Sequence, residues 1–460
     1  MTAPTLLRPR VDSGLAERFA RSAAVRGVGT QLRTEDFAGW LAERGRAHRF
    51  RVERIAFAEL DGWSFQPDSG NLGHRSGRFF TVEGLHVTTD EQPFPQWQQP
   101  IIRQPEVGIL GILVKEFDGV LHFLMQAKME PGNANLLQLS PTVQATRSNY
   151  TKVHNGADVR YIDYFREPGR GRVLADALQS EHGSWFYRKS NRNMIVEARG
   201  EVELHEDFVW LTLGQIGELL ERDDVVNMDS RTVLSCVPAG SDGTGALDSD
   251  TELLSWFTGE RSRHDVRART VPLNSIDDWV RGEQSIEHVH GRYFSVVAVA
   301  VQADNREVTG WTQPLFEPVG LGVTAFLLRH FDGVPHVLMH ARVEGGFVDT
   351  VEAGPTVQYT PANYAALPTE QRPPFLDLVL GTPAENIRYE AVHSEEGGRF
   401  LNARSRYLVV DAPKEVPDEP PPGYRWASLG QLSSLVRHGH YLNVQARTLL
   451  SLFHTGAVRP

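Results

Sequence analysis

The sequence predicts a mixed α/β fold, built as two tandem copies of one domain that arose by internal duplication. The motifs GRFF, FDGV and PTVQ begin at Gly77, Phe117 and Pro141, and GRYF, FDGV and PTVQ return further along the chain at one common spacing. The first of these returns begins at Gly291, 214 positions after Gly77. Both copies also contain apolar runs and a capped helical pattern, which together indicate sheets covered by helices. A repeat of this length indicates a duplicated domain rather than a solenoid.

The elements of each copy can be read in order. Residues 107–117 (VGILGILVKEF) form a nearly continuous apolar run, as expected of a buried strand. Asp118-Gly119 is a favoured two-residue hairpin turn before a second apolar run at 120–128, and Asp332-Gly333 repeats it. A helix is expected near the end of each copy, where capping-box spacing precedes an apolar periodic pattern, at Thr212 with Gln215 and at Ser428 with Gln431.

The repeat divides the chain into four segments. Residues 1–35 are not duplicated, and we expect a helical extension that packs on the other domain or on another subunit. Residues 36–238 and 251–460 are the two copies. Residues 239–250 are rich in Gly, Ser and Asp and are interpreted as a linker.

Composition excludes several classes of protein. The net charge of −11 argues against a nucleic-acid binder. The sequence contains no apolar run of membrane-spanning length, and the first residues lack the apolar core of a secretory signal, so we expect a cytoplasmic protein with no membrane contact. Cys236 is the only cysteine, which excludes an internal disulfide and a cysteine-based zinc site. The phosphate-binding motifs GxGxxG and GxxxxGK[ST] are absent, so no nicotinamide or P-loop site is indicated.

The densest polar clusters are TVQATRSNY at 142–150 and its counterpart TVQYTPANY at 356–364. Each follows an apolar strand, and the ends of strands are frequent ligand sites in α/β proteins. Arg147 has the chemistry to pair with a phosphate, and Asn149 and Tyr150 with a sugar or base. The alternative is a helix N-cap followed by a packed tyrosine, and the sequence leaves both open.

A second cluster, SWFYRKSNRNMIVE at 184–197, combines aromatic rings with Arg and Lys, a combination that suits a nucleoside diphosphate. Its alternative is an amphipathic edge strand with solvated cations. Trp63 and Trp279 occupy matching early positions in the two copies, either as core residues or as stacking platforms. His288 and His290 would share one face of a strand, but without a third ligand nearby we predict no metal site.

Taken in order, several segments resemble the NDP-hexose 2,3-dehydratases of bacterial deoxysugar biosynthesis. They span nearly the whole chain from about Trp40 onward: DGWSF, GRFFTVEG, QWQQPII, LLQLSPTVQATRSNY, SEHGSWFYRKSNRNMIVE and VNMDSRTVLSC. The resemblance implies two Nudix-like domains, a homodimer and a dTDP-4-keto-6-deoxyhexose substrate. The glutamate-rich Nudix metal motif is replaced by TVQATRSNYTKVHNG, so the resemblance implies sugar-nucleotide binding without metal-dependent hydrolysis and without a cofactor.

The implied reaction removes water across C2 and C3 of the sugar, and an NADPH-dependent 3-ketoreductase is the expected consumer of the product. We expect Tyr150, Glu197 and His182 as acid/base candidates. The diphosphate is assigned to Arg147, Arg231 and Lys189, although Arg231 could instead cap or pair near the last helix. Trp63 and Trp185 are expected to stack on base or sugar. Further expected substrate contacts are Thr146, Ser148, Asn149, Tyr150, Trp279, Thr360, Asn363, Tyr364 and Arg447.

The two copies differ in chemical content. Arg147 of the first copy corresponds to Pro361 of the second, and Trp185 and Lys189 correspond to Arg399 and Ala403. We therefore predict that a pocket built mainly on the first copy is catalytic and that the second is a residual binding site or a structural partner. The alternatives are that both are active or that each pocket borrows residues from the other copy. Competing functions are a degenerate Nudix-type nucleotide-sugar hydrolase and a non-catalytic nucleotide-sugar-binding protein.

Overall fold

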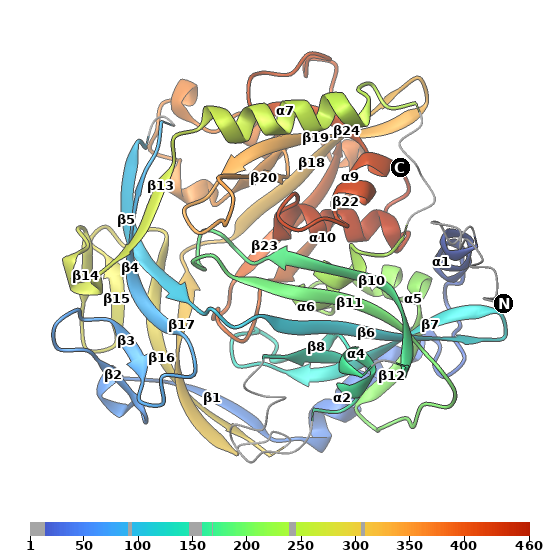
Figure 1. The fold of residues 1–460 in the computed structure, drawn as a ribbon, viewed down its shortest axis with the longest axis horizontal. Helices are drawn as coiled ribbons and strands as arrows, with labels where there is room; N and C mark the ends of the chain where they lie inside the picture. Colours follow the sequence, from blue (N-terminus) through green and yellow to red (C-terminus); the bar gives the residue numbers. More distant parts are fainter. Residues whose placement is uncertain (1–13, 91–93, 147–158, 168, 239–244, 305–308) are drawn as a thin grey trace, which may run out of the picture.

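The computed structural model describes residues 14–90, 94–146, 159–167, 169–238, 245–304 and 309–460. Its strands form two seven-stranded sheets and two five-stranded sheets, and the small sheets gather on one side of the molecule (Figure 1). The predicted mixed α/β fold with duplicated domains is confirmed.

The two large sheets have the same topology, one in each repeat. In each, a central strand runs parallel to one neighbour and antiparallel to the others, so both sheets are mixed. The first sheet has the order β10 (Gly171–Ser180), β11 (Ser190–Ala198), β6 (Gly108–Phe117), β7 (Val120–Met129), β12 (Phe208–Thr212), with β8 (Leu137–Ser140) on β7 and β9 (Val143–Ala145) on β6. The second has the order β20 (Val351–Gly354), β19 (Val334–Val343), β18 (Gly322–Phe331), β23 (Arg404–Asp411), β22 (Ile387–Ser394), with β21 (Val357–Tyr359) on β18 and β24 (Tyr424–Ser428) on β19.

The predicted hairpins and helix starts are present. Asp118 and Gly119 have φ values of 49° and 78°, and Asp332 and Gly333 have 49° and 80°. Positive φ at both central residues is what a type I′ turn requires, and it explains the Asp-Gly pair. Each predicted capping box opens a helix, with the N-cap side chain accepting from the backbone N–H three residues on.

The small sheets exchange strands between the repeats. The one built on β4 (Thr81–Thr88) is completed by β13 of the second repeat, and the one built on β16 (Phe294–Ala303) by β1 of the first. The first of these sheets contains β2 (Trp63–Phe65), β3 (Leu72–His74), β4, β5 (Gln96–Arg103) and β13 (Arg267–Val271); the second contains β1 (Phe50–Ile55), β14 (Trp279–Arg281), β15 (Ser285–His288), β16 and β17 (Gly310–Pro318). Neither repeat therefore completes its own small sheet.

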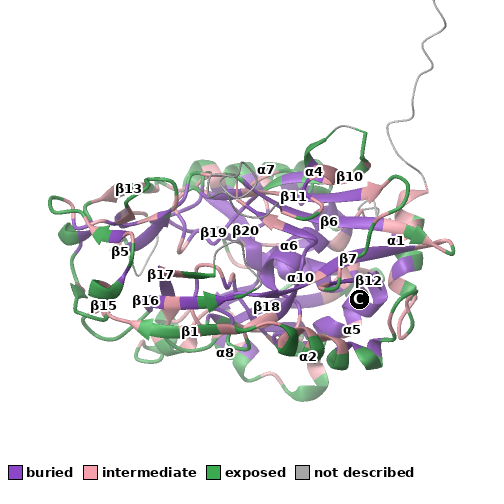
Figure 2. Cartoon of the chain, turned by 90° about the horizontal axis from the view of Figure 1, so that it is seen from below, coloured by how far each residue is buried: buried purple, intermediate pink, exposed green. Residues whose placement is uncertain are grey.

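The helices join the large sheets into one core. Side chains from both repeats form a single buried cluster in which α6 and α10 lie against each other, and Figure 2 shows these helices buried at the centre. The described helices are α1 (Leu15–Ala24), α2 (Phe37–Ala47), α4 (Asp163–Arg166), α5 (Leu213–Leu220), α6 (Met228–Leu234), α7 (Asp250–Arg263), α8 (Leu376–Leu380), α9 (Leu429–Leu435) and α10 (Val444–His454).

The N-terminal helix and the strand after residue 189 differ in part from what the sequence predicts. Within the N-terminal extension, Leu15–Ala24 form helix α1, which packs mainly on β7 and α5 of the adjacent first repeat, where Ser22 donates to the Leu121 carbonyl. The alternative of an edge strand at 184–197 is wrong, because β11 lies between β10 and β6 inside the sheet. Across the described ranges, no helix combines the length and apolarity needed to cross a membrane.

Candidate active site

A cavity of about 1150 Å³ opens between the second repeat's large sheet and the neighbouring small sheets. That volume is in the range of sites that enclose a drug-sized or larger ligand. Its floor comes from β18, β19 and β21 of the second repeat, whereas β5 and the loop after β10 of the first repeat supply one wall. We call it the cross-repeat cavity. The residues discussed below that line it are Trp97, Gln98, Gln99, His182, Trp185, Trp279, Arg342, Glu344, Gln358, Thr360, Asn363, Tyr364, Glu395 and Ser405.

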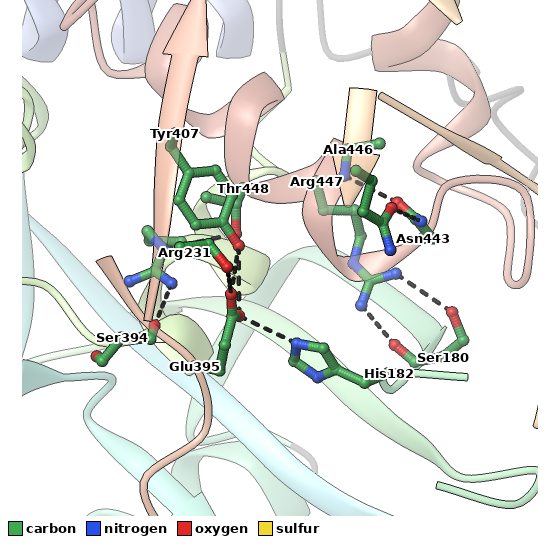
Figure 3. Close-up of polar contacts among 12 residues, drawn as sticks. Ser180, His182, Arg231, Ser394, Glu395, Tyr407, Asn443, Ala446, Arg447 and Thr448 are labelled. Carbon is green, nitrogen blue, oxygen red and sulfur yellow. Dashed lines mark hydrogen bonds and ion pairs between the residues drawn. The ribbon is translucent and has the colours of Figure 1, made fainter. Parts of the chain in front are cut away.

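The most distinctive feature of the cavity is an acid–base pair with one member from each repeat. His182 follows β10 and Glu395 follows β22, and His182 Nε2 lies 3.0 Å from Glu395 Oε2 (Figure 3). Glu395 Oε1 also accepts from Ser405 Oγ at 2.9 Å and from Tyr407 OH at 3.0 Å. Both members of the pair are buried.

Each member of this pair shifts the pKa of the other. Burial opposes the imidazolium of His182, but its hydrogen bond to Glu395 and the charge of Glu395 outweigh burial and raise the pKa of His182. Burial would likewise raise the pKa of Glu395, but the hydrogen bond and charge of His182 lower it. The arrangement therefore favours a cationic histidine beside a carboxylate.

A second carboxyl group, that of Glu344, lies close to this pair at the end of β19. Its Oε1 accepts from Arg342 Nε at 2.7 Å and from Gln358 Nε2 at 2.9 Å. A Cβ at Gly183, the neighbour of His182, would lie 2.9 Å from Glu344 Oε2, so the glycine permits this close approach. Within the described part of the chain, neither Glu344 Oε2 nor His182 Nδ1 has a hydrogen-bond partner. Buried polar atoms are rarely left unpaired, so the two mark a place for a polar ligand.

Aromatic rings form the walls of the cavity. Trp97 donates its indole N–H to Gln99 Oε1 and Trp279 donates to the Gln98 carbonyl, so both rings are fixed in place. Trp185 stacks on His182 with ring centroids 5.4 Å apart. Burial raises the pKa of Tyr364 to about 12, which keeps its hydroxyl a hydrogen-bond donor at neutral pH. These groups suit a ligand with a flat base and a polar sugar.

Related positions form a charged cluster that combines Lys128 and Glu130 of the first repeat with Glu396 and Arg399 of the second. Glu130 occupies the position of Glu344, 214 residues earlier, and its Oε1 accepts from Gln144 Nε2 at 2.7 Å and lies 3.6 Å from Lys128 Nζ. Glu396 takes the place that His182 holds in the other repeat. Burial, together with the charge of Glu181, raises the pKa of Glu396 to about 7 although Arg399 opposes it.

The structure brings together some of the residues predicted from sequence. His182 and Trp185 of the first repeat line the same cavity as four predicted residues of the second repeat, namely Trp279, Thr360, Asn363 and Tyr364. This cavity therefore combines predicted residues of both copies. Arg147, Ser148, Asn149 and Tyr150 lie outside the described residues. Thr146 is half-buried at the end of a described segment.

Other predicted residues lie elsewhere. Trp63 is buried in the core of the small sheets and donates its indole N–H to the Thr312 carbonyl. Lys189 is buried and donates to the Glu106 carbonyl and to Asn191 Oδ1. Both residues lie outside the lining of the cross-repeat cavity.

Three predicted residues lie outside the lining of the cavity. Glu197 lies on β11 and forms an ion pair with Arg18 of α1. Arg231 and Arg447 each have at most 1% of their surface exposed, and their guanidinium groups donate to backbone carbonyls. The sequence alone does not show this burial, because an arginine on a helix with capping signals has the same local pattern whether it faces a cavity or a core.

Sequence reasoning also missed Trp97, Arg342, Glu344 and Glu395. A usable signal existed for the two glutamates, because Glu130 and Glu344, and Glu181 and Glu395, stand at the repeat spacing. A carboxyl retained at the end of an apolar strand in both copies has no role in the core, which points to a site.

The comparisons with known proteins agree with this duplicated architecture. The sequence profile of the family described as NDP-hexose 2,3-dehydratase matches twice, at residues 34–237 and 250–453. A protein of Amycolatopsis orientalis named dTDP-4-dehydro-6-deoxy-alpha-D-glucopyranose 2,3-dehydratase is 62% identical over 461 residues, covering 99% of this chain and 97% of the relative. Proteins of the same name from Saccharopolyspora spinosa (50% identical, covering 97% of this chain and 96% of the relative) and Streptomyces violaceoruber (51%, 92% and 97%) are also similar. The chain therefore belongs to the NDP-hexose 2,3-dehydratase family.

Proposed function

We propose that this enzyme removes water across C2 and C3 of dTDP-4-keto-6-deoxyglucose, and that the reaction takes place in the cross-repeat cavity. The main support for this location is the His182–Glu395 pair, which lies beside Glu344 in a cavity lined by aromatic rings. Among the described residues, His182 Nδ1 and Glu344 Oε2 have no hydrogen-bond partner. The proposed substrate and reaction are supported by the family and by the names of relatives at 50–62% identity.

The chemistry divides between the two unpaired groups. The C4 ketone of the substrate acidifies the C3 hydrogen, and the carboxylate of Glu344 removes that proton to give an enolate. The enolate electrons then form the C2–C3 double bond as the C2 hydroxyl leaves, and cationic His182 gives that hydroxyl the proton it needs to depart as water. The resulting enol takes a proton from solvent at C2 and gives the proton of its C3 hydroxyl to neutral His182, so that C3 becomes a keto group and the histidine is again cationic. Glu344 releases the proton taken from C3 to solvent. Water is the only species lost, and no net oxidation occurs.

Other residues of the cavity are assigned to binding the substrate and to polarising its C4 ketone. Arg342 lies in the cavity, and the charge of Glu344 keeps it protonated although burial opposes this. We assign to Arg342 and Tyr364 the stabilisation of negative charge on the C4 oxygen, because preorganised donors are most effective where charge develops. Trp97 and Trp279 are assigned to the thymine ring.

Incubation with dTDP-4-keto-6-deoxyglucose tests the reaction. The expected product has lost one water by mass spectrometry, and a deuterium label at C3 is lost to solvent. Release of a nucleoside monophosphate would instead indicate a hydrolase, and unchanged sugar nucleotide that remains bound would indicate a binding protein. Full retention of deuterium in the dehydrated product would exclude this mechanism.

The expected partners are also proposals. We infer a homodimer in the cytoplasm, and light scattering at micromolar concentration should give twice the mass of 51.4 kDa. The product carries adjacent keto groups at C3 and C4, so an NADPH-dependent 3-ketoreductase is the expected next enzyme. A monomer in solution would contradict the first of these inferences.

A further inference from the structure

Two buried arginines cross between the repeats at the centre of the molecule. Arg231 of α6 donates through Nη1 to the Val226 carbonyl at 2.6 Å and through Nη2 to the Ser394 carbonyl at 2.6 Å. Arg447 of α10 repeats the pattern, with Nη2 donating to the Ser180 carbonyl at 2.5 Å (Figure 3). Each guanidinium thus holds a strand end of the opposite repeat.

These strand ends carry the proposed acid–base pair. Ser394 immediately precedes Glu395, and Ser180 lies two residues before His182. Arg231 thus binds the chain where it leaves β22, just before Glu395. Arg447 binds the chain where it leaves β10, just before His182. Both partners of the pair are fixed from the other repeat.

The two arginines also contact each other's helices. Arg447 Nε donates to Thr232 Oγ1 at 2.7 Å, and Arg231 Nε lies 3.4 Å from Thr448 Oγ1. Neither arginine forms an ion pair with a carboxylate within the described ranges. Burying two charges without a direct ion pair is costly, although the charges of Glu352 and Glu395 offset part of the cost. Two such arginines at matching places in one core therefore suggest that the geometry of their hydrogen bonds matters.

We propose that Arg231 and Arg447 are positioning residues, which set the contact between His182 and Glu395 by fixing the serine carbonyls that precede them. The inference rests on the proposed function of that pair. A planar guanidinium can donate at the same time to three acceptors. They are the serine carbonyl of the other repeat, the carbonyl just before its own helix and a threonine hydroxyl. A lysine keeps the charge but cannot hold these acceptors together.

The test compares Arg231→Lys and Arg447→Lys with wild type. We expect kcat to fall about 10- to 100-fold, because small displacements of catalytic groups have effects of that size. KM and the affinity for dTDP, measured by calorimetry, should change less than about threefold, since neither arginine lines the cavity. The alkaline limb of the pH–rate profile should move to lower pH, because a looser contact with Glu395 stabilises the imidazolium less.

Matched controls separate positioning from stability. Ser235 directly follows α6 and Ser451 lies on α10, and Ser235→Ala and Ser451→Ala remove hydroxyls that donate to carbonyls of these same helices. We expect these variants to lower Tm and to leave kcat unchanged. An unchanged kcat and pH profile in folded lysine variants would overturn the proposal and leave the arginines as structural clamps.

Two further variants keep the outcome decisive. If a lysine variant fails to fold, Thr232→Val removes the hydroxyl that accepts from Arg447 Nε and from Asn193 Nδ2. Asn193→Ala removes the Asn193 contact and is the control. A kcat below that of Asn193→Ala at constant KM then supports the proposal, and a kcat equal to it overturns the proposal. His182→Asn tests the proposed function separately. If His182→Asn is fully active, the acid–base pair itself is wrong; if it is inactive while the arginine variants keep full kcat, only the positioning role fails.

Discussion

At the scale of single residues, the ionisation of His182 governs the expected pH dependence. Its raised pKa depends on Glu395, so the cationic acid is present below that pKa and is lost as the pH rises through it. Glu395→Gln keeps the hydrogen bond and removes the charge, and should move the alkaline limb of kcat to lower pH by about 1–2 units. A pH–rate profile measures this shift. An unchanged alkaline limb would show that another group supplies the proton.

Glu352 gives a stability prediction at the same scale. Burial raises the pKa of Glu352 to about 8 even though Ser180 Oγ donates to it and Arg447 is nearby. The folded protein thus keeps a proton that the unfolded chain releases near pH 4.5, so stability falls as the pH rises from about 4.5 to 8. Glu352→Gln should therefore raise the free energy of unfolding by about 1–3 kcal/mol at pH 8 and far less at pH 4.5. Equal effects at both pH values, measured by denaturant titration, would contradict this.

At the scale of elements, the exchanged strands make each repeat depend on the other. In β1, Val52 pairs with Val301 and Glu53 with Ala300 of β16. Successive N–H groups of a strand point to opposite sides, so a proline at one of these two positions removes a bond to β16. Val52→Pro or Glu53→Pro should reduce hydrogen-exchange protection in β16, although about 250 residues separate the two strands. Val52→Ala is the control, and equal protection in all three variants would argue against the exchange.

The same elements show what the sequence could and could not predict. Asp-Gly turns and capping boxes are local signals, and the structure reproduces them at Asp118, Asp332, Thr212 and Ser428. Strand exchange has no local signal, because an apolar strand is equally satisfied by either sheet. His182 was predicted as an acid/base candidate, but its pairing with Glu395 was not. The two residues follow strands of different repeats and meet only in the folded structure.

At the scale of the whole molecule, the two repeats share one core and are expected to fold together. The buried cluster contains Phe123 and Val233 of the first repeat and Val409 and Leu449 of the second. Residues 1–244 and 245–460 expressed separately should each expose much of this apolar surface and give poorly cooperative unfolding. Mixing the two fragments should restore a cooperative transition in calorimetry. A cooperative transition from either fragment alone would show independent domains.

The residues that line the cavity also bear on which repeat performs the chemistry. Divergence between the copies predicted a catalytic pocket built mainly on the first copy, and Arg147 to Tyr150, on which that prediction depends, lie outside the described residues. The cross-repeat cavity, however, takes His182 and Trp185 from the first copy and Glu344 from the second. We therefore expect catalysis to need both copies, with the acid from one and the base from the other.

The most direct test of this central claim is a comparison of Glu344→Gln with its matched counterpart Glu130→Gln. Both carboxyls accept from a glutamine and pair with a cation, so the two substitutions remove comparable contacts. Glu344→Gln should lower kcat for water loss by more than about 100-fold while dTDP still binds, and Glu130→Gln should lower it by less than about tenfold. Near wild-type turnover by Glu344→Gln together with an inactive, folded Glu130→Gln variant would contradict the account and place the chemistry in the first repeat.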